Sequence, residues 1–119
     1  MYIAEAGAGT KYAVRAEAVK CGKDVSAAVT GGTLSHVGAV SLAQYEPERD
    51  SATVSTAAAY THRDGEISAL FAKRIASALK CNAAVSAGIH IDGASQEELA
   101  LLRKNASECL DRLIAALSD

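Results

Sequence analysis

The chain has 119 residues and a mass of 12.2 kDa, with 12 Lys and Arg residues against 14 Asp and Glu residues. This length allows one domain, 1–119, and excludes two domains of ordinary size. The net charge is −2 and no cluster of Lys and Arg exceeds two consecutive residues, so we expect neither nucleic acid nor a membrane as a partner. Because alanine supplies 26 residues, the predicted core is thin, and a partner surface would add to the buried area.

The first residues of the chain do not have the pattern of a secretory leader, since they lack both a basic segment and an apolar stretch. Residues 25–45 carry no formal charge, but Gly, Ser and Thr interrupt this run too often for a membrane helix. The cysteines, Cys21, Cys81 and Cys109, are odd in number and widely spaced, which argues against a disulfide framework or a zinc site. We therefore expect a cytoplasmic protein with free thiols.

The first half of the sequence predicts β-strands. Apolar residues alternate with polar ones, which is the period of a strand with one buried face. Strands are expected over 12–20, 24–30, 37–45 and 52–60, with a further strand over 1–6. We interpret Gly31-Gly32 as part of a loop between two strands, and 46–50 as a hairpin connection.

The second half changes to the period of a helix and then alternates once more. Ile67, Leu70, Phe71, Ile75 and Leu79 define one face of a helix with Asp64 as its N-cap. A strand is predicted over 83–91, and Ser95 to Glu98 form a capping box that begins a second helix. The sequence thus predicts an α+β fold, with a largely antiparallel sheet of five to six strands and two helices of the C-terminal half on one face.

The alternation also predicts what the other sheet face carries. Val40, Leu42 and Val54 are expected to meet the helices, which leaves mainly Ala, Ser, Thr and Gly pointing away from them. A face of small residues allows another sheet to approach closely. We therefore expect a homo-oligomer, a dimer or higher, formed either sheet on sheet or across an edge strand. The alternative is a sheet face that is exposed to solvent and has no partner.

Each of the three histidines falls at the end of a predicted element: His36, His62 and His90. His90 and Asp92 lie two residues apart on one strand face, close enough to share a site. We expect the three imidazoles to converge at one end of the sheet. No metal-ligand spacing supports a metal site, yet a small metal- or anion-binding enzyme that uses His36, His62, His90 and Asp92 remains the alternative function.

Gly31-Gly32 matches neither a dinucleotide fingerprint nor a P-loop, because it does not open a helix. Glycine amides can still bind an anion, as can the helix start at Arg63 and Asp64. We predict a ligand or partner site, with no catalytic constellation; its candidate residues are Gly31, Gly32, His36, His62, Arg63, Asp64, His90 and Asp92.

Three stretches of the sequence resemble the LpdD-like family, the small D subunit of gallate decarboxylase and its relatives. The first runs from Gly22 through Gly31-Gly32 to Val40, the second is His62-Arg63-Asp64, and the third is Ala87 to Asp92 with the pattern Gly-Ile-His-Ile-Asp. The likeness spans roughly residues 20–117. Ser35, Arg63-Asp64 and Gly93 depart from the pattern we expect there, namely Pro, Lys-Glu and Asn.

This resemblance implies a non-catalytic accessory protein, a chaperone for an aromatic acid decarboxylase that uses prenylated flavin mononucleotide. The decarboxylase subunit would be its partner, and prenylated FMN or FMN would be contacted at most transiently. The family is also described as similar to proteasome assembly chaperones, which dimerise.

Overall fold

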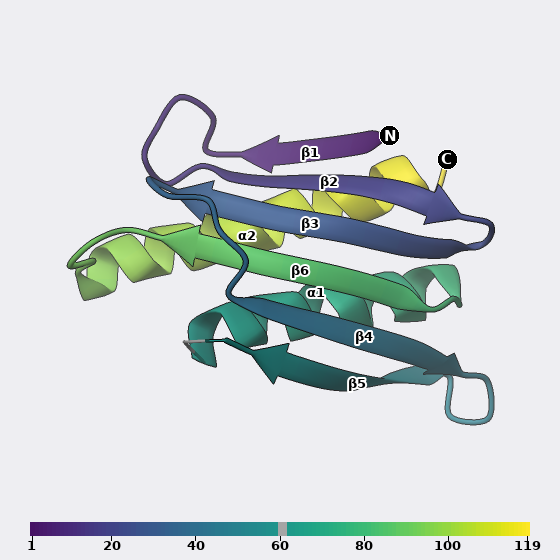
Figure 1. The fold of residues 1–119 in the computed structure, drawn as a ribbon. Helices are drawn as coiled ribbons and strands as arrows, with labels where there is room; N and C mark the ends of the chain where they lie inside the picture. The colour runs from purple at the N-terminus through teal and green to yellow at the C-terminus, as the bar shows by residue number, and fades with distance from the viewer. Residues whose placement is uncertain (60–61) are drawn as a thin grey trace.

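The computed structural model describes residues 1–59 and 62–119, and the side chains of residues 62 and 63 lie outside this description. The described part contains one six-stranded sheet and two helices (Figure 1). In chain order the elements are β1 (Tyr2–Ala6), β2 (Val14–Cys21), β3 (Asp24–Gly32), β4 (Ala39–Glu46), β5 (Ser51–Ala58), α1 (His62–Leu79), β6 (Ala83–His90) and α2 (Gln96–Leu117). The predicted α+β fold is confirmed.

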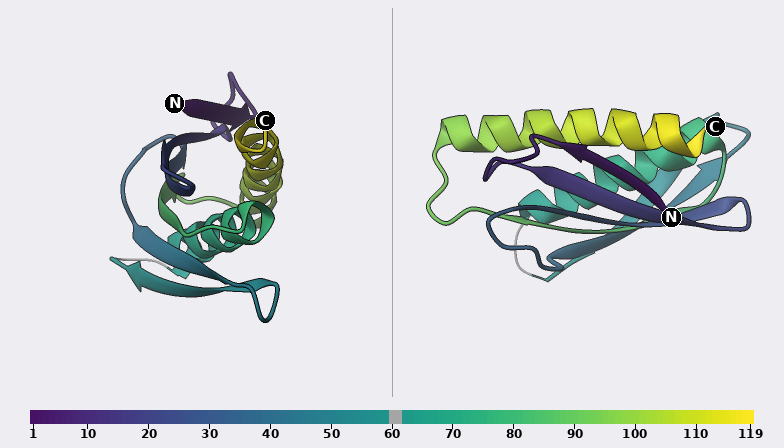
Figure 2. Two further views of the ribbon diagram at one scale, coloured as in Figure 1. Left: turned by 90° about the vertical axis from the view of Figure 1, so that its right-hand side faces the viewer. Right: turned by 90° about the horizontal axis from the view of Figure 1, so that it is seen from above.

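The strands are ordered β1-β2-β3-β6-β4-β5, so the chain leaves a gap between β3 and β4 that β6 later fills. β3 and β6 run parallel, and the other described pairs are antiparallel. Both helices cover the same face of the sheet (Figure 2), α1 over β4, β5 and β6 and α2 over β1 and β2. The segment 33–38, called the crossover below, carries the chain from β3 past the end of β6 to β4.

The core lies between the sheet and the helices. Large side chains come mainly from the helices, among them Phe71, Ile75 and Leu113, and all three are fully buried. The strands contribute mostly alanine and valine side chains to the core, such as Ala16 and Val85. Small strand residues let the helices approach the sheet closely, which is how a chain this rich in alanine still forms a close-packed interior.

The predicted face of β4 is wrong. Val40 and Leu42 point away from the helices and are 46% and 57% exposed, whereas Ala39, Ser41 and Ala43 are buried. Alternation alone fixes two faces but not which one is inward. Here α1 lies close to β4, so the small residues face the helix and the two larger ones face outward.

The reason Ser41 can be buried is a cluster of hydroxyl groups under α1. Its Oγ lies 2.7 Å from both the Ser68 hydroxyl and the Thr56 hydroxyl. Ser68 is fully buried on α1, while Leu70, which we predicted to face the core, is 43% exposed. Their mutual hydrogen bonds offset the cost of burying these hydroxyl groups. The polar residue Ser41 therefore lies on the buried face of β4 and not on its solvent-exposed face.

Gly31-Gly32 does not form a loop, contrary to our prediction. Both residues extend β3, where Gly31 pairs with Val14 and Ile89 and Gly32 pairs with His90. Gly32 has a φ of +75°, which favours glycine, and it turns the chain into the crossover. The break that the sequence indicates at residue 31 therefore falls two residues later, at residue 33.

The predicted capping box of α2 is confirmed and is part of a larger polar cluster. The Ser95 side chain accepts a hydrogen bond from the Glu98 amide, and the Glu98 carboxylate accepts one from the Ser95 amide. Lys11 lies 3.0 Å from the same carboxylate, and the Tyr12 hydroxyl donates to it. These contacts, the Ser95 amide first and then Lys11, lower the pKa of Glu98 to about 2.

We expect Glu98→Gln to lower the melting temperature at pH 7, because Gln keeps the cap but loses the charge that Lys11 and the helix terminus stabilise. The pKa of Glu98 is depressed on folding, so its contribution is present above pH 4.5 and is lost as the pH falls toward 2. Melting curves from pH 7 to 2 should therefore show the variant and the wild type converging in acid. Glu97→Gln, one position away on α2, is the control, and an equal effect from that variant would contradict the prediction.

Candidate functional site

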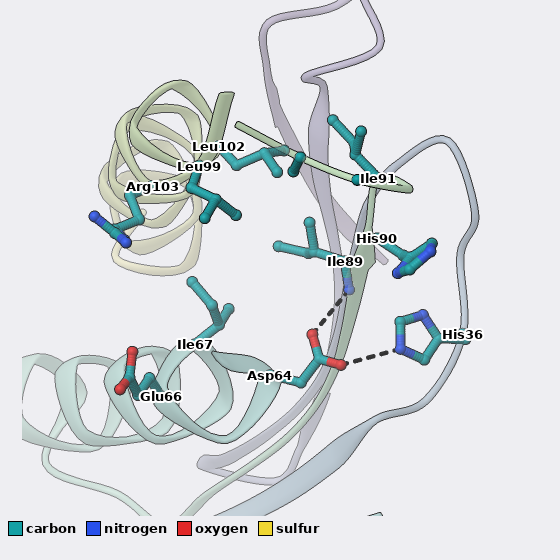
Figure 3. A pocket seen from close by; sticks show the side chains of 12 residues that line it. His36, Asp64, Glu66, Ile67, Ile89, His90, Ile91, Leu99, Leu102 and Arg103 are labelled. Carbon is teal, nitrogen blue, oxygen red and sulfur yellow. Dashed lines mark hydrogen bonds and ion pairs between the residues drawn. The ribbon is translucent and has the colours of Figure 1, made fainter. Parts of the chain in front are cut away.

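Two histidine–aspartate pairs meet where the crossover, the start of α1 and the carboxyl end of β6 come together. His36 Nε2 lies 3.0 Å from Asp64 Oδ2 (Figure 3), and His90 Nε2 lies 2.6 Å from Asp92 Oδ1. The two imidazole rings are 6.2 Å apart between centroids and nearly perpendicular. Residues from three separate stretches of sequence thus form one polar cluster.

Asp64 joins these three segments. It is the third residue of α1, because the helix begins at His62, and so it is not the N-cap that we predicted. The residue is 3% exposed, and its Oδ1 accepts a hydrogen bond of 3.0 Å from the Ile89 amide. Strand β4 pairs with β6 only from Ala83 to Ala87, so Asp64 supplies the acceptor that β4 no longer offers at Ile89.

The two histidines remain open to solvent, with side chains 35% exposed for His36 and 44% exposed for His90. Each imidazole directs Nε2 at a carboxylate, which favours the proton on that nitrogen. The Nδ1 atom of a neutral His90 ring is then an acceptor, and protonation makes it a donor. Nδ1 of His36 instead lies 3.5 Å from the Leu34 carbonyl oxygen, which can only accept a hydrogen bond. Through His90 the cluster can therefore bind either a proton donor or, when the ring is charged, an anion.

Four predicted site residues are not part of this cluster: two of them lie elsewhere in the fold, and the side chains of the other two are not described by the structure. The side chains of His62 and Arg63 lie outside the described residues, so the predicted convergence of three imidazoles is observed for two of them. Gly31 and Gly32 do not line the pocket described below, although Gly32 pairs with His90 in the sheet.

Two glycines that we did not single out as site residues make the cluster possible. A Cβ atom on Gly88 would overlap the backbone carbonyl oxygen of His36, and one on Gly38 would overlap the carboxylate of Asp64. Any side chain at either position would push the crossover away from β6 or displace the carboxylate. Both glycines fall within the stretches that resemble the LpdD-like family. The sequence therefore contained these positions, but it did not show that each one is needed to avoid a steric clash.

A pocket of about 400 Å³ adjoins the histidines and extends between the two helices. Its walls are aliphatic, formed by Ile67 of α1, by Ile89 and Ile91 at the end of β6, and by Leu99 and Leu102 of α2 (Figure 3). His36 and His90 border it on one side, and Glu66 and Arg103 approach it from the helices. An apolar pocket with a few polar groups is typical of a small-molecule site.

Among the described side chains, those of residues 1–59 and 64–119, no group of three or more His, Cys, Asp or Glu is arranged to hold a metal ion. The thiols do not add to the site: burial raises the pKa of Cys109 to about 11, and Cys109 donates to the Ala4 carbonyl in the core. No helix of the described residues is long and apolar enough to cross a membrane.

The fold is similar to that of a protein of known structure. A solved structure described as a novel chaperone complex for yeast 20S proteasome assembly matches it with a TM-score of 0.64, over 98% of this chain and 99% of that one. The two sequences are 14% identical, so this likeness shows the shared fold alone.

The family follows from the sequence. The model of the prenylated flavin chaperone LpdD-like domain matches residues 8–118, and the chain belongs to this family. The resemblance stated from the sequence motifs is thereby confirmed. A search of curated proteins found no match.

Proposed function

We propose that this protein is a non-catalytic accessory subunit that assists the assembly or cofactor loading of an aromatic acid decarboxylase dependent on prenylated FMN. The observation that carries the proposal is the family match over residues 8–118, which includes every residue of the His–Asp cluster. The partner decarboxylase or the flavin phosphate would be contacted by the predicted site residues, with His36, Asp64, His90 and Asp92 at the centre.

The chemistry of the cluster suits a phosphate. His90 directs Nε2 at Asp92, and in its charged form Nδ1 would donate a strong hydrogen bond to an anionic oxygen. Arg63 would add a charge at the start of α1. Prenylated flavin would supply its decarboxylation chemistry in the partner enzyme, whereas this chain would bind and orient the cofactor or the partner during transfer.

The decisive experiment is co-expression of a prenylated-FMN-dependent decarboxylase with and without this chain. We expect more soluble holoenzyme in its presence, measured as flavin absorbance per mole of purified decarboxylase. A His36→Ala, His90→Ala double variant should lose this gain, while Lys73→Gln on the exposed side of α1 should keep it. Unchanged cofactor loading with the wild-type chain would overturn the proposed function.

We also propose that the chain forms a homodimer through the sheet face opposite the helices. Val40 and Leu42 are exposed on this face, beside small residues such as Ser55 and Ser86 on the neighbouring strands. Two such faces can pack at the usual distance of about 10 Å between sheets. The partner copy would cover Val40 and Leu42.

Leu42→Lys should therefore convert a dimer into a monomer, because a buried lysine on each side of the interface would lack a partner. Light scattering at micromolar concentration measures the mass directly. Leu101→Lys is the matched control, since Leu101 is a similarly exposed leucine on α2. A monomeric wild-type chain would exclude this interface.

A further inference from the structure

The pocket between the helices has an apolar interior that the core does not fill. Ile67 and Leu99 belong to the stripes that each amphipathic helix directs toward the sheet, yet both are only partly buried because they border the pocket. Leu102 and Ile89 complete the wall (Figure 3). Its volume of about 400 Å³ lies within the range typical of small-ligand sites and is large enough for an aromatic ring with its substituents.

The charges around the pocket favour an anionic group on that ligand. Arg103 lies one helical turn after Leu99 on α2 and borders the pocket with an exposed guanidinium. Among the described residues it makes no hydrogen bond or ion pair, including with Glu66 on the facing helix. The buried carboxylate of Asp64 already accepts from the Ile89 amide and contacts His36.

The two helices reinforce this preference. Both α1 and α2 begin at the pocket end of the molecule, so the positive ends of their dipoles point toward it. An unpaired guanidinium beside an apolar wall binds a carboxylate or phosphate in a bidentate manner without displacing another partner.

We propose that this pocket binds a small organic anion, a carboxylate or phosphate monoester with an apolar body of the size of one aromatic ring. The apolar body would lie between Ile67, Ile89 and Leu102, and Arg103 would hold the anion. This inference goes beyond the proposed function, because it requires neither a partner protein nor a flavin.

The test uses the isolated full-length chain and three probes that share a phenyl ring: benzoate, phenyl phosphate and the neutral benzyl alcohol. In ¹H–¹⁵N NMR titrations we expect shifts at the amides of the residues that line the pocket, among them Ile89, Ala94 and Leu102. At least one anion should bind about tenfold more tightly than benzyl alcohol, because the charged hydrogen bond adds to the apolar contact. The tighter anion identifies the head group, and no shift at these amides with any probe would overturn the proposal.

Two variants separate the charge from the cavity. Arg103→Gln should abolish the tenfold preference for the anion, and Lys104→Gln, which removes the same charge one residue along α2 outside the pocket, should retain it. Ala94→Phe should fill the pocket and prevent binding of all three probes, with Leu99→Ser as the second wall variant if the first does not fold. Wild-type anion affinity in a folded Arg103→Gln variant would contradict the proposal. Flavin loading of the decarboxylase tests the proposed function in a separate experiment. The anion-binding proposal and the proposed function can therefore be overturned independently of each other.

Discussion

Replacing Gly88 by alanine should lower the free energy of unfolding by about 3 kcal/mol or more. The added Cβ atom would overlap the carbonyl oxygen of His36, which is a backbone atom and has no rotamer to change. The crossover is tied to β6 on both sides of this contact, by hydrogen bonds of 2.8 Å from the Thr33 amide to His90 and from the Gly38 amide to Ala87. It can move only by breaking them, so the His36–Asp64 pair should be lost with the stability.

Urea unfolding measures the first effect, and the NMR signals of the His36 ring report the second. Gly65→Ala is the matched control, because Gly65 lies in α1 and its nearest contact would be the Thr56 methyl group at 3.5 Å. There we expect a gain of up to about 1 kcal/mol from helix propensity. If Gly88→Ala unfolded at the wild-type urea concentration, the close approach of the crossover to β6 would be refuted.

The elements that could be predicted from the sequence are those whose signal is local. Alternation located β2, β3 and β6, because each of these strands buries one face in period two. The capping box at Ser95 fixed the start of α2, because both of its hydrogen bonds join residues three apart. Such features depend on neighbours in the chain and not on the rest of the fold.

The errors arose where a distant element decided the outcome. The face of β4 depends on α1, whose Ser68 hydroxyl meets Ser41 and makes the small polar face the buried one. Gly31-Gly32 looked like a break because β6, which pairs with both residues, comes more than fifty positions later. Strand order is a long-range property, and a single sequence carries little information about it.

The candidate site shows the same division. The pairing of His90 with Asp92 could be expected from a spacing of two on a strand, and the structure shows their hydrogen bond. The contact of His36 with Asp64 could not be expected from spacing, because 28 residues separate them and Asp64 looked like a cap. The same side chain can cap a helix or accept from a strand, and only the position of Ile89 distinguishes these two roles.

Asp64→Ala should be the most damaging change at the site that leaves the backbone unaltered. It removes the acceptor of the Ile89 amide and the partner of His36 at a position that is 3% exposed. A buried amide without an acceptor and a lost partner for a histidine together predict a loss of about 3 kcal/mol. Asp64→Asn keeps an oxygen for the amide and should cost roughly half as much.

Hydrogen exchange of the Ile89 amide separates this explanation from a general loss of stability. Its exchange should accelerate in Asp64→Ala more than that of Val85, which is paired with strands on both sides, and it should stay slow in Asp64→Asn. Asp92→Ala is the control, because the Asp92 side chain is 99% exposed and its ion pair with His90 should contribute at most about 1 kcal/mol. Since the Asp64 carboxylate replaces strand β4 at this edge, Ile89 protection that survived in Asp64→Ala would mean that another group serves as the acceptor there.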